Sequence, residues 1–256
     1  MTVNDVFQWL DSFAPFDTQD EYDNAGLLAG DPKAEVFKIL FALDVTRPVV
    51  AEAVRFGAEL IVAHHPLMFR PVRQLRYDQG EGAVLKALIK SGVSLIAAHT
   101  NLDRCAGGVA DSLAQALALS QVTPCEGSPY LRKGTLKAPC AAKELLIMIN
   151  RRLSARTRMY GDADTVIQSV AVTPGAGGED YVHALSDAFV TGEIKHHELL
   201  DAMDRGLIVF DAGHYPTEFP GVSALYKRFL KAASKSDWQV EAKLYTQPPY
   251  PCASHG

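Results

Sequence analysis

The sequence predicts an α/β protein with a mostly parallel sheet, and three observations lead to this prediction. Four short apolar runs rich in branched residues have the pattern of buried strands, at 38–43, 59–63, 93–98 and 207–210. Segments with helical spacing separate the first three runs. Polar residues follow each run where a strand would end. Because open parallel sheets bind ligands at the carboxyl ends of their strands, these polar residues are expected to share one edge.

Local patterns predict the helices of the first part of the chain. The opening helix is expected to start after Thr2, whose hydroxyl can cap it, and to close before Pro15. Two further helices are expected at 48–57 and 81–92, because each helical pattern finishes on a glycine, the residue that most readily takes the left-handed conformation there.

A second α/β unit is expected as an insertion. Its predicted parts are a helix near 141–153, a strand near 166–172, a glycine-rich turn at 174–178 and the segment 192–206. The fourth apolar run would then return the chain to the first sheet, followed by a helix at 222–233. The predicted domains are therefore residues 1–126 together with 207–256, and the inserted residues 127–206.

Composition places the protein among ordinary globular proteins. The chain has 256 residues, of which 48% are hydrophobic and 21% charged, enough for a well-formed core. No apolar stretch approaches the roughly 20 residues that cross a bilayer, and the first residues lack the pattern of a secretory signal. The four cysteines are scattered without a C-x-x-C pair, which fits structural thiols in a reducing compartment. A cytoplasmic protein with no membrane partner is expected.

The charge is unevenly distributed along the chain. The net charge is −5, but residues 128–162 carry eight Lys and Arg residues against two acids. Such a region can attract an anionic substrate or nucleic acid, although a solvated face is the simpler interpretation. No nucleic-acid-binding motif accompanies it, so a nucleic-acid partner is not expected.

Five side chains from distant segments predict a metal centre. They are His64, His65, Asp103, His214 and Glu218. Imidazole and carboxylate ligands without thiolate suit zinc, manganese, iron, cobalt or nickel better than copper(I) or an iron–sulfur cluster, and this much histidine disfavours calcium. His64 and His65 lie just past a predicted strand, where Pro66 turns the chain away. Each can then meet a different ion, so two divalent ions per chain are expected.

Each part of this pattern also has a purely structural interpretation. A histidine at a strand end is often only hydrogen-bonded, and residues 99–103 can form a polar turn before a helix. The tyrosine and proline that follow His214 favour a turn, rather than a continuous helix, as far as Glu218. Asp44 is either the partner of a metal ligand or, more simply, a turn residue. The joint placement of these groups after predicted strands favours the metal centre.

A two-metal site with open positions is suited to hydrolysis, because it lowers the pKa of bound water to about 7. The candidates for a general acid or base are His99, Glu193, His196 and His197. The last three alternatively form the polar start of a helix. The turn at 175–178 can cradle phosphate through its amides, but it lacks the known phosphate-binding patterns, and a simple turn is favoured.

These residues lie in blocks that resemble a known family. The blocks are DNAGL (23–27), LDVT (43–46), AHHPLMF (63–69), HTNLD (99–103) with the glycines 107–108, TGE (191–193) with the histidines 196–197, and GHY (213–215) with Glu218. In this order they are similar to the NIF-three-like dinuclear metal-centre family, often labelled GTP cyclohydrolase I type-two homologues. One departure is Tyr22, where the family commonly has tryptophan.

The resemblance implies a fold, an assembly and a ligand set. The fold would be two intertwined three-layer α/β units with mostly parallel sheets, assembled as a ring-shaped homohexamer with its metal sites facing the interior. The five residues named above would hold the two ions, with Glu218 bridging. Two-metal chemistry, the further histidines and the basic region 128–162 together predict a metal-dependent hydrolase of a small anionic, nucleotide-like substrate. GTP ring opening is one version, although no purine-reading motif is present. The alternative is a non-catalytic, metal-dependent assembly or interaction scaffold.

Overall fold

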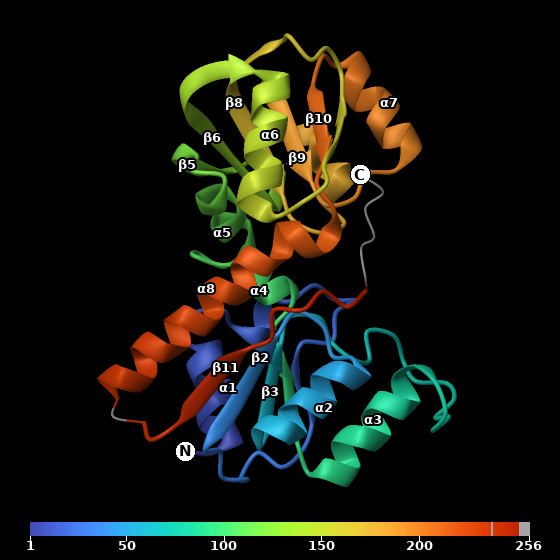
Figure 1. Cartoon of the computed structure of the whole chain (residues 1–256), viewed down its shortest axis with the longest axis vertical. Coiled ribbons are helices and arrows are strands. Elements are labelled where there is room, and N and C mark those ends of the chain that lie inside the picture. Colours follow the sequence, from blue (N-terminus) through green and yellow to red (C-terminus); the bar gives the residue numbers. More distant parts are fainter. Residues whose placement is uncertain (237, 251–256) are drawn as a thin grey trace. The chain divides into compact units, whose positions relative to one another are not determined.

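The computed structural model describes residues 1–236 and 238–250, which form two compact units (Figure 1). Unit 1 comprises Met1–Cys105 and Leu225–Gly256, and unit 2 comprises Ala106–Ala224. The second unit is thus inserted into the first, as the sequence suggests. The boundaries differ from the expected ones at 126/127 and 206/207, so that the segments 106–126 and 207–224 belong to unit 2.

Unit 1 is built on a five-stranded sheet in the order β1-β4-β3-β2-β11. The strands are β1 (Gly26–Ala29), β2 (Lys38–Ala42), β3 (Leu60–Ala63), β4 (Ser94–Ala97) and β11 (Glu241–Leu244). All neighbours are parallel except β1, which pairs with β4 in the antiparallel sense. The first three predicted strands are therefore confirmed, and so is their parallel arrangement.

Helices cover both faces of this sheet. They are α1 (Val3–Asp11), α2 (Arg47–Phe56), α3 (Gly80–Ser91), the short α4 (Thr100–Arg104), the 3-10 turn η1 (Phe16–Thr18) and the second half of α8 (His214–Lys235). Apolar residues of β2, β3 and β4 pack against α2 and α3 on one face. On the other face, Phe229 of α8 contacts Phe41 of β2 and Trp9 of α1, with ring centroids 5.3 and 5.2 Å apart. Unit 1 therefore has three layers.

The sequence signals at the helix ends are confirmed. The Thr2 hydroxyl accepts a hydrogen bond from the backbone N–H of Asp5, at 3.2 Å, and caps α1. Gly57 and Gly92 follow α2 and α3 with φ of 76° and 69°, the left-handed conformation that glycine adopts without steric cost.

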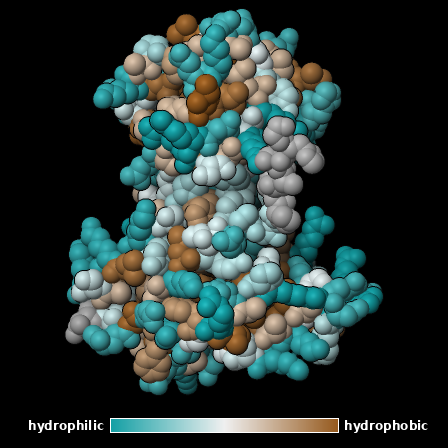
Figure 2. Space-filling view, viewed as in Figure 1, coloured by the Kyte–Doolittle hydropathy of each residue, from teal (hydrophilic) through white to brown (hydrophobic). Residues whose placement is uncertain are grey.

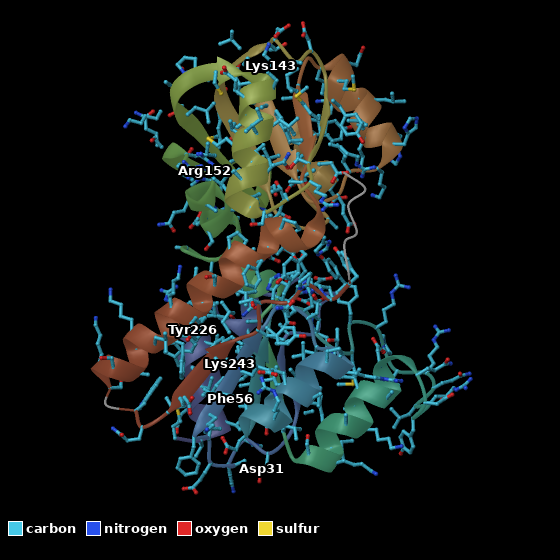
Figure 3. All side chains as sticks on the ribbon, in the orientation of Figure 1. Asp31, Phe56, Lys143, Arg152, Tyr226 and Lys243 are labelled. Atoms are coloured by element: carbon cyan, nitrogen blue, oxygen red, sulfur yellow. The ribbon has the colours of Figure 1, made fainter. Side chains whose placement is uncertain are left out.

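Strand β11 is an edge strand that the sequence did not reveal. Side chains hold it against β2 and its covering helices. The Lys243 ammonium bonds Glu52 at 2.6 Å and lies over the Phe56 ring, and the Tyr226 hydroxyl donates to the carbonyl of Ala242 (Figure 3). The strand that completes the sheet of unit 1 thus follows unit 2 in the sequence.

Unit 2 has a mixed six-stranded sheet in the order β5-β6-β8-β9-β10-β7. The strands are β5 (Ser120–Cys125), β6 (Ser128–Ala141), β7 (Arg158–Tyr160), β8 (Val166–Thr173), β9 (Ala188–Thr191) and β10 (Ile208–Asp211). Strands β8, β9 and β10 are parallel, and the other pairs are antiparallel.

The sheet of unit 2 also has helices on both faces. Its helices are α5 (Val109–Ala116), α6 (Ala142–Leu153), the 3-10 helix η2 (Gly177–His183), α7 (His196–Asp204) and the first half of α8. Residues of α5 and α6 pack on one face, and residues of α7 and η2 pack on the other. The α/β class with two three-layer units is confirmed.

Two sequence expectations about the last part of the chain are wrong. The run at 207–210 forms β10, which pairs with β9 and β7 in unit 2 instead of returning to the first sheet. A short buried strand has the same pattern in either sheet, because its partners lie elsewhere in the chain. Helix α8 begins at His214 and continues without the expected turn. Pro216 is tolerated because the first-turn amides of a helix have no partner within it.

The basic region of residues 128–162 is partly neutralised within unit 2. Arg132 pairs with Asp111, Arg158 pairs with Asp211, and Lys143 bonds Asp164 at 2.5 Å. Lys143 and Arg152 both belong to α6 (Figure 3). The face drawn in Figure 2 mixes hydrophilic and hydrophobic residues.

Two further expectations concern membranes and thiols. No helix among residues 1–236 and 238–250 has the length and apolarity needed to span a bilayer. Cys105, Cys125 and Cys140 form no disulfide within the described residues, as expected, and Cys252 lies outside them.

Candidate metal centre

Three histidines of unit 1 meet at the carboxyl ends of β3 and β4. His64 and His65 directly follow β3, and His99 follows β4 by two residues. Their candidate ligand nitrogens all lie within 4.8 Å of one another. His64 is fully buried, whereas the other two are partly exposed. The sheet therefore delivers imidazoles to one point at its edge, and His99 joins the two histidines that the sequence singled out as ligands.

All three rings are oriented through Nδ1. The acceptors are the Ala98 carbonyl for His64 (2.8 Å), Asp44 Oδ1 for His65 (2.8 Å) and Asp23 Oδ1 for His99 (2.7 Å). Carbonyl and ionised carboxylate oxygens only accept hydrogen bonds, so Nδ1 carries the proton in each ring. Nε2 then keeps its lone pair for a ligand. Metal-binding histidines are held in this way, with the second nitrogen donating to a carbonyl or carboxylate.

Asp103 adds a carboxylate to this group. Helix α4 places its Oδ1 atom 3.4 Å from Nε2 of His64. Two donor atoms at about 2.1 Å from one ion, and about 90–109° apart, are separated by about 3.0–3.4 Å. Because Nδ1 of His64 is bonded to the Ala98 carbonyl, Nε2 is the ring nitrogen that faces the Asp103 carboxylate. The pair therefore fits two ligands of one divalent ion.

Unit 2 holds a second pair with the same geometry. His214 is the first residue of α8 and Glu218 lies one turn later, with Nε2 and Oε1 3.0 Å apart. Nδ1 of His214 lies 2.9 Å from Oε1 of Glu193, in the loop after β9, so this ring too is oriented by a carboxylate. Glu218 is only 4% exposed. Imidazole and a buried carboxylate on one helical turn make a bidentate donor set for a divalent ion.

Asp23 was missed by the sequence reasoning as a site residue. Its buried carboxylate accepts hydrogen bonds from His99 and from the amide and hydroxyl of Thr100. Burial alone would raise the pKa of Asp23, but these hydrogen bonds hold it well below its usual value. The carboxylate therefore stays ionised and keeps His99 in one orientation. For Asp44, the structure favours the ligand-partner interpretation over the turn.

The other catalytic candidates have less support. Glu193 contacts His214, as described above, and therefore orients a ring. His196 and His197 are the first residues of α7 and are exposed. Neither belongs to a potential metal-binding group within the described part of the chain. The structure thus supports their alternative interpretation as the polar start of a helix.

A surface pocket of about 680 Å³ adjoins His65 within unit 1. Its walls come from residues after β2 and β3 and from the start of α3. Arg47 is the only Lys or Arg in this lining, and its guanidinium donates to the carbonyl of Asp78 at 2.6 Å. Three acids, Asp44, Asp78 and Glu81, share the lining. A ligand that presents hydrogen-bond donors is favoured on this side of His65.

The orienting contact of Asp44 leads to a first prediction. In Asp44→Ala, the His65 ring loses its acceptor, and the affinity of the metal-free protein for Zn²⁺ is expected to fall about 10–100-fold. Asp78→Ala is the matched control, because Asp78 lines the same pocket but pairs with Arg76 instead of a histidine. Zinc titration with a competing chelator measures both, and equal affinities in the two variants would contradict the role of Asp44.

Comparison with known proteins places the chain in a family. Residues 1–251 match the family model of Duf34/NIF3 (NGG1p interacting factor 3). The chain belongs to this family. The expectation drawn from the motif blocks is therefore confirmed.

Relatives in the NIF3 family cover nearly the whole chain. The GTP cyclohydrolase 1 type 2 homolog of Clostridium perfringens is 32% identical over 251 residues, which are 94% of this chain and 95% of the relative. The homolog of Streptomyces coelicolor is 33% identical over 264 residues, covering 96% and 93% of the two chains.

Solved structures share the NIF3 fold. The Staphylococcus aureus protein SA1388 superposes with a TM-score of 0.91 at 27% identity and covers 100% of this chain and 99% of its own. Reduced HcgD from Methanocaldococcus jannaschii gives a TM-score of 0.78 at 29% identity, with 95% and 97% covered. The Bacillus cereus protein related to NIF3 has a TM-score of 0.93 at 22% identity and covers 100% and 99%, which supports the fold alone.

Proposed function

We propose that this NIF3-family protein binds two divalent metal ions and hydrolyses a small, nucleotide-like anion. The proposed ligands are His64, His65 and Asp103 from unit 1, and His214 and Glu218 from unit 2. The observation that carries the proposal is the orientation of the histidines: each of these rings donates from Nδ1 to an acceptor and presents Nε2. The 3.4 and 3.0 Å donor separations in the two units match two ligands on one ion.

Divalent ions on these donors would polarise a scissile bond and lower the pKa of water from 15.7 to about 7. The donor set contains nitrogen and oxygen only, which suits zinc, manganese, iron, cobalt or nickel. Which of these ions is bound would follow from availability, because imidazole and carboxylate accept all of them.

His99 is the side chain proposed to move a proton. Its Nδ1 is tied to Asp23, and its ring lies against those of His64 and His65, with centroids 5.2 and 5.5 Å away. In this arrangement Nε2 of His99 accepts a proton from water, and the ionised Asp23 stabilises the resulting imidazolium. His99 is also close enough to these rings to act as a further ligand.

Two features support an anionic substrate: exposed basic side chains in unit 2, and the names of the related proteins. Arg151 and Arg156 are exposed bases of the 128–162 region, and the relatives carry the name GTP cyclohydrolase 1 type 2 homolog. The acidic pocket beside His65 instead favours the donor-bearing part of such a molecule, such as an amino group or a hydroxyl. We further propose that the protein acts in the cytoplasm as a homohexamer, the assembly that the family resemblance implies.

The test uses protein purified without an affinity tag or added metal. Elemental analysis is expected to find about two equivalents of a transition metal per chain, as expected for a two-metal site. A panel of nucleotides, nucleosides and phosphoesters should then reveal hydrolysis that is lost with a chelator and in Glu218→Ala. If chelation instead dissociates the oligomer and no compound is turned over, the protein is a metal-dependent scaffold. A metal-free protein that gains nothing on reconstitution would refute the metal centre itself.

A further inference from the structure

The glycine-rich turn after β8 lies directly against the His214–Glu218 pair. Gly175 has a left-handed φ of +60°. A Cβ atom on this residue would lie 2.0 Å from Oε1 of Glu218 and 3.2 Å from Nε2 of His214, which are the two proposed donor atoms. The missing side chain of Gly175 therefore leaves the space that the Glu218 carboxylate occupies.

Two other residues fix the backbone at this point. The N–H of Gly175 donates to the Thr217 hydroxyl at 3.1 Å. That hydroxyl lies 2.9 Å from the Gly213 carbonyl and 2.8 Å from the His214 carbonyl, in the first turn of α8, and Thr217 is fully buried. Gly192 closes the other side, since a Cβ there would lie 2.5 Å from the Gly175 carbonyl oxygen and 2.6 Å from Thr217 Oγ1. The turn is therefore locked to the helix that carries the donors.

We propose that Gly175 is a positioning residue for the metal donors of unit 2, His214 and Glu218. The Gly175 backbone limits how far the Glu218 carboxylate can move towards the turn after β8. The hydrogen bond to the Thr217 hydroxyl fixes the position of that backbone. This inference rests on the proposed metal binding and adds a determinant of its geometry. It also gives the glycine-rich turn a role other than cradling phosphate, because the Gly175 amide is already committed to Thr217.

The distances around Gly175 show how far a methyl group at this position would displace the Glu218 carboxylate. Real Cβ atoms essentially never approach another heavy atom within 3.0 Å, so the Glu218 oxygen must retreat by about 1 Å in Gly175→Ala. Metal–ligand distances tolerate only about ±0.2 Å. Glu218 is only 4% exposed, so the displaced carboxylate has to move among packed neighbours. The substitution is therefore expected to remove Glu218 from the coordination shell.

The experiment compares Gly175→Ala with Gly206→Ala in chelator-treated full-length protein titrated with Zn²⁺. Gly206 is the matched control, because it lies in the same unit at φ +82° and a Cβ atom there would meet nothing within 4 Å. Both variants carry the left-handed strain, and only one carries the clash. Zinc affinity is expected to fall at least about tenfold in Gly175→Ala, on the scale of lost orienting contacts, and to stay at the wild-type value in Gly206→Ala.

Different results separate this inference from the proposed function. Wild-type protein that binds Zn²⁺ while Gly175→Ala binds it equally well would overturn the positioning role alone. Wild-type protein that binds no Zn²⁺ would overturn the metal centre, and the positioning role with it.

A second pair of variants decides the question if Gly175→Ala fails to fold. Thr217→Val keeps the volume and removes the acceptor of the Gly175 amide, whereas Thr217→Ser keeps the hydroxyl. Zinc affinity is expected to fall about tenfold in Thr217→Val, at the low end of the range for lost orienting contacts, and to be restored in Thr217→Ser. Thermal unfolding of the metal-free variants shows how far each affects the fold as a whole. Equal zinc affinities in the two variants would overturn the proposal.

Discussion

His64→Ala is expected to lower the affinity of unit 1 for a divalent ion by more than about 100-fold, because loss of a ligand exceeds the effect of losing its orienting partner. His64 is the fully buried member of the histidine group and the one that faces Asp103. Its removal leaves Asp103 without the nitrogen that shares its ion. The neighbouring rings of His65 and His99 are each held through Nδ1 by their own carboxylate, so neither is free to turn into the place of His64.

Zinc titration of metal-free protein measures this effect, with circular dichroism to verify the fold. His183→Ala is the control: this histidine is exposed and stands outside the metal-binding groups among the described residues. The control should bind as the wild type does. Full affinity in His64→Ala would mean that the histidines at the strand ends are structural, and the hydrolase proposal would lose its basis.

Phe229→Ala is expected to cost about 3–5 kcal/mol of unfolding free energy, the usual loss for a large aromatic side chain removed from a packed core. Phe229 lies on the second half of α8 and is fully buried. Its ring contacts Phe41, Trp9 and Trp238, with centroids 5.3, 5.2 and 5.9 Å away. The cavity would therefore open between the sheet of unit 1 and two elements that cover it.

Urea unfolding followed by tryptophan fluorescence would report this loss, because both tryptophans contact Phe229. The neighbouring Leu230 is 41% exposed and provides the control. Leu230→Ala keeps the helix propensity and should cost less than about 1 kcal/mol. Similar losses for the two variants would show that the second half of α8 does not pack on the sheet as described.

The parts of the fold that depend on short-range patterns could be predicted from the sequence. Helices α2 and α3 show a regular apolar spacing that finishes on glycine, and β2, β3 and β4 are compact apolar runs. The assignment of β10 failed because nothing in four buried residues specifies which sheet they join. Strand β11 could not be predicted for another reason. It is a short edge strand with charged side chains and an exposed first residue. Its contacts are with distant residues such as Glu52.

In the candidate site, too, residues with a local sequence signal could be predicted, and residues that depend on distant partners could not. His64, His65, Asp103, His214 and Glu218 attract notice because histidines and acids cluster after apolar runs. Asp23 could not be assigned a role, since it meets His99 across 76 residues of sequence.

The role of Gly175 could not be predicted from the sequence, because it depends on which residues lie next to it in space. Its importance lies in an atom that it lacks, and only the position of Glu218 reveals this. The helical continuity from His214 to Glu218 was missed because a proline usually signals a break, whereas in the first turn of a helix it is permitted.

The pairing of β11 with β2 determines the order in which a growing chain can fold. Lys38 of β2 leaves the ribosome about 200 residues before its partner Glu241. Unit 2 is continuous from Ala106 to Ala224 and is complete in sequence while unit 1 still lacks its edge strand and the helix half bearing Phe229. Vectorial synthesis usually lets the N-terminal domain finish first, and here it finishes last. Until β11 has been synthesised, unit 1 lacks the edge neighbour of β2, and the edge of this apolar strand is open to pairing with other chains.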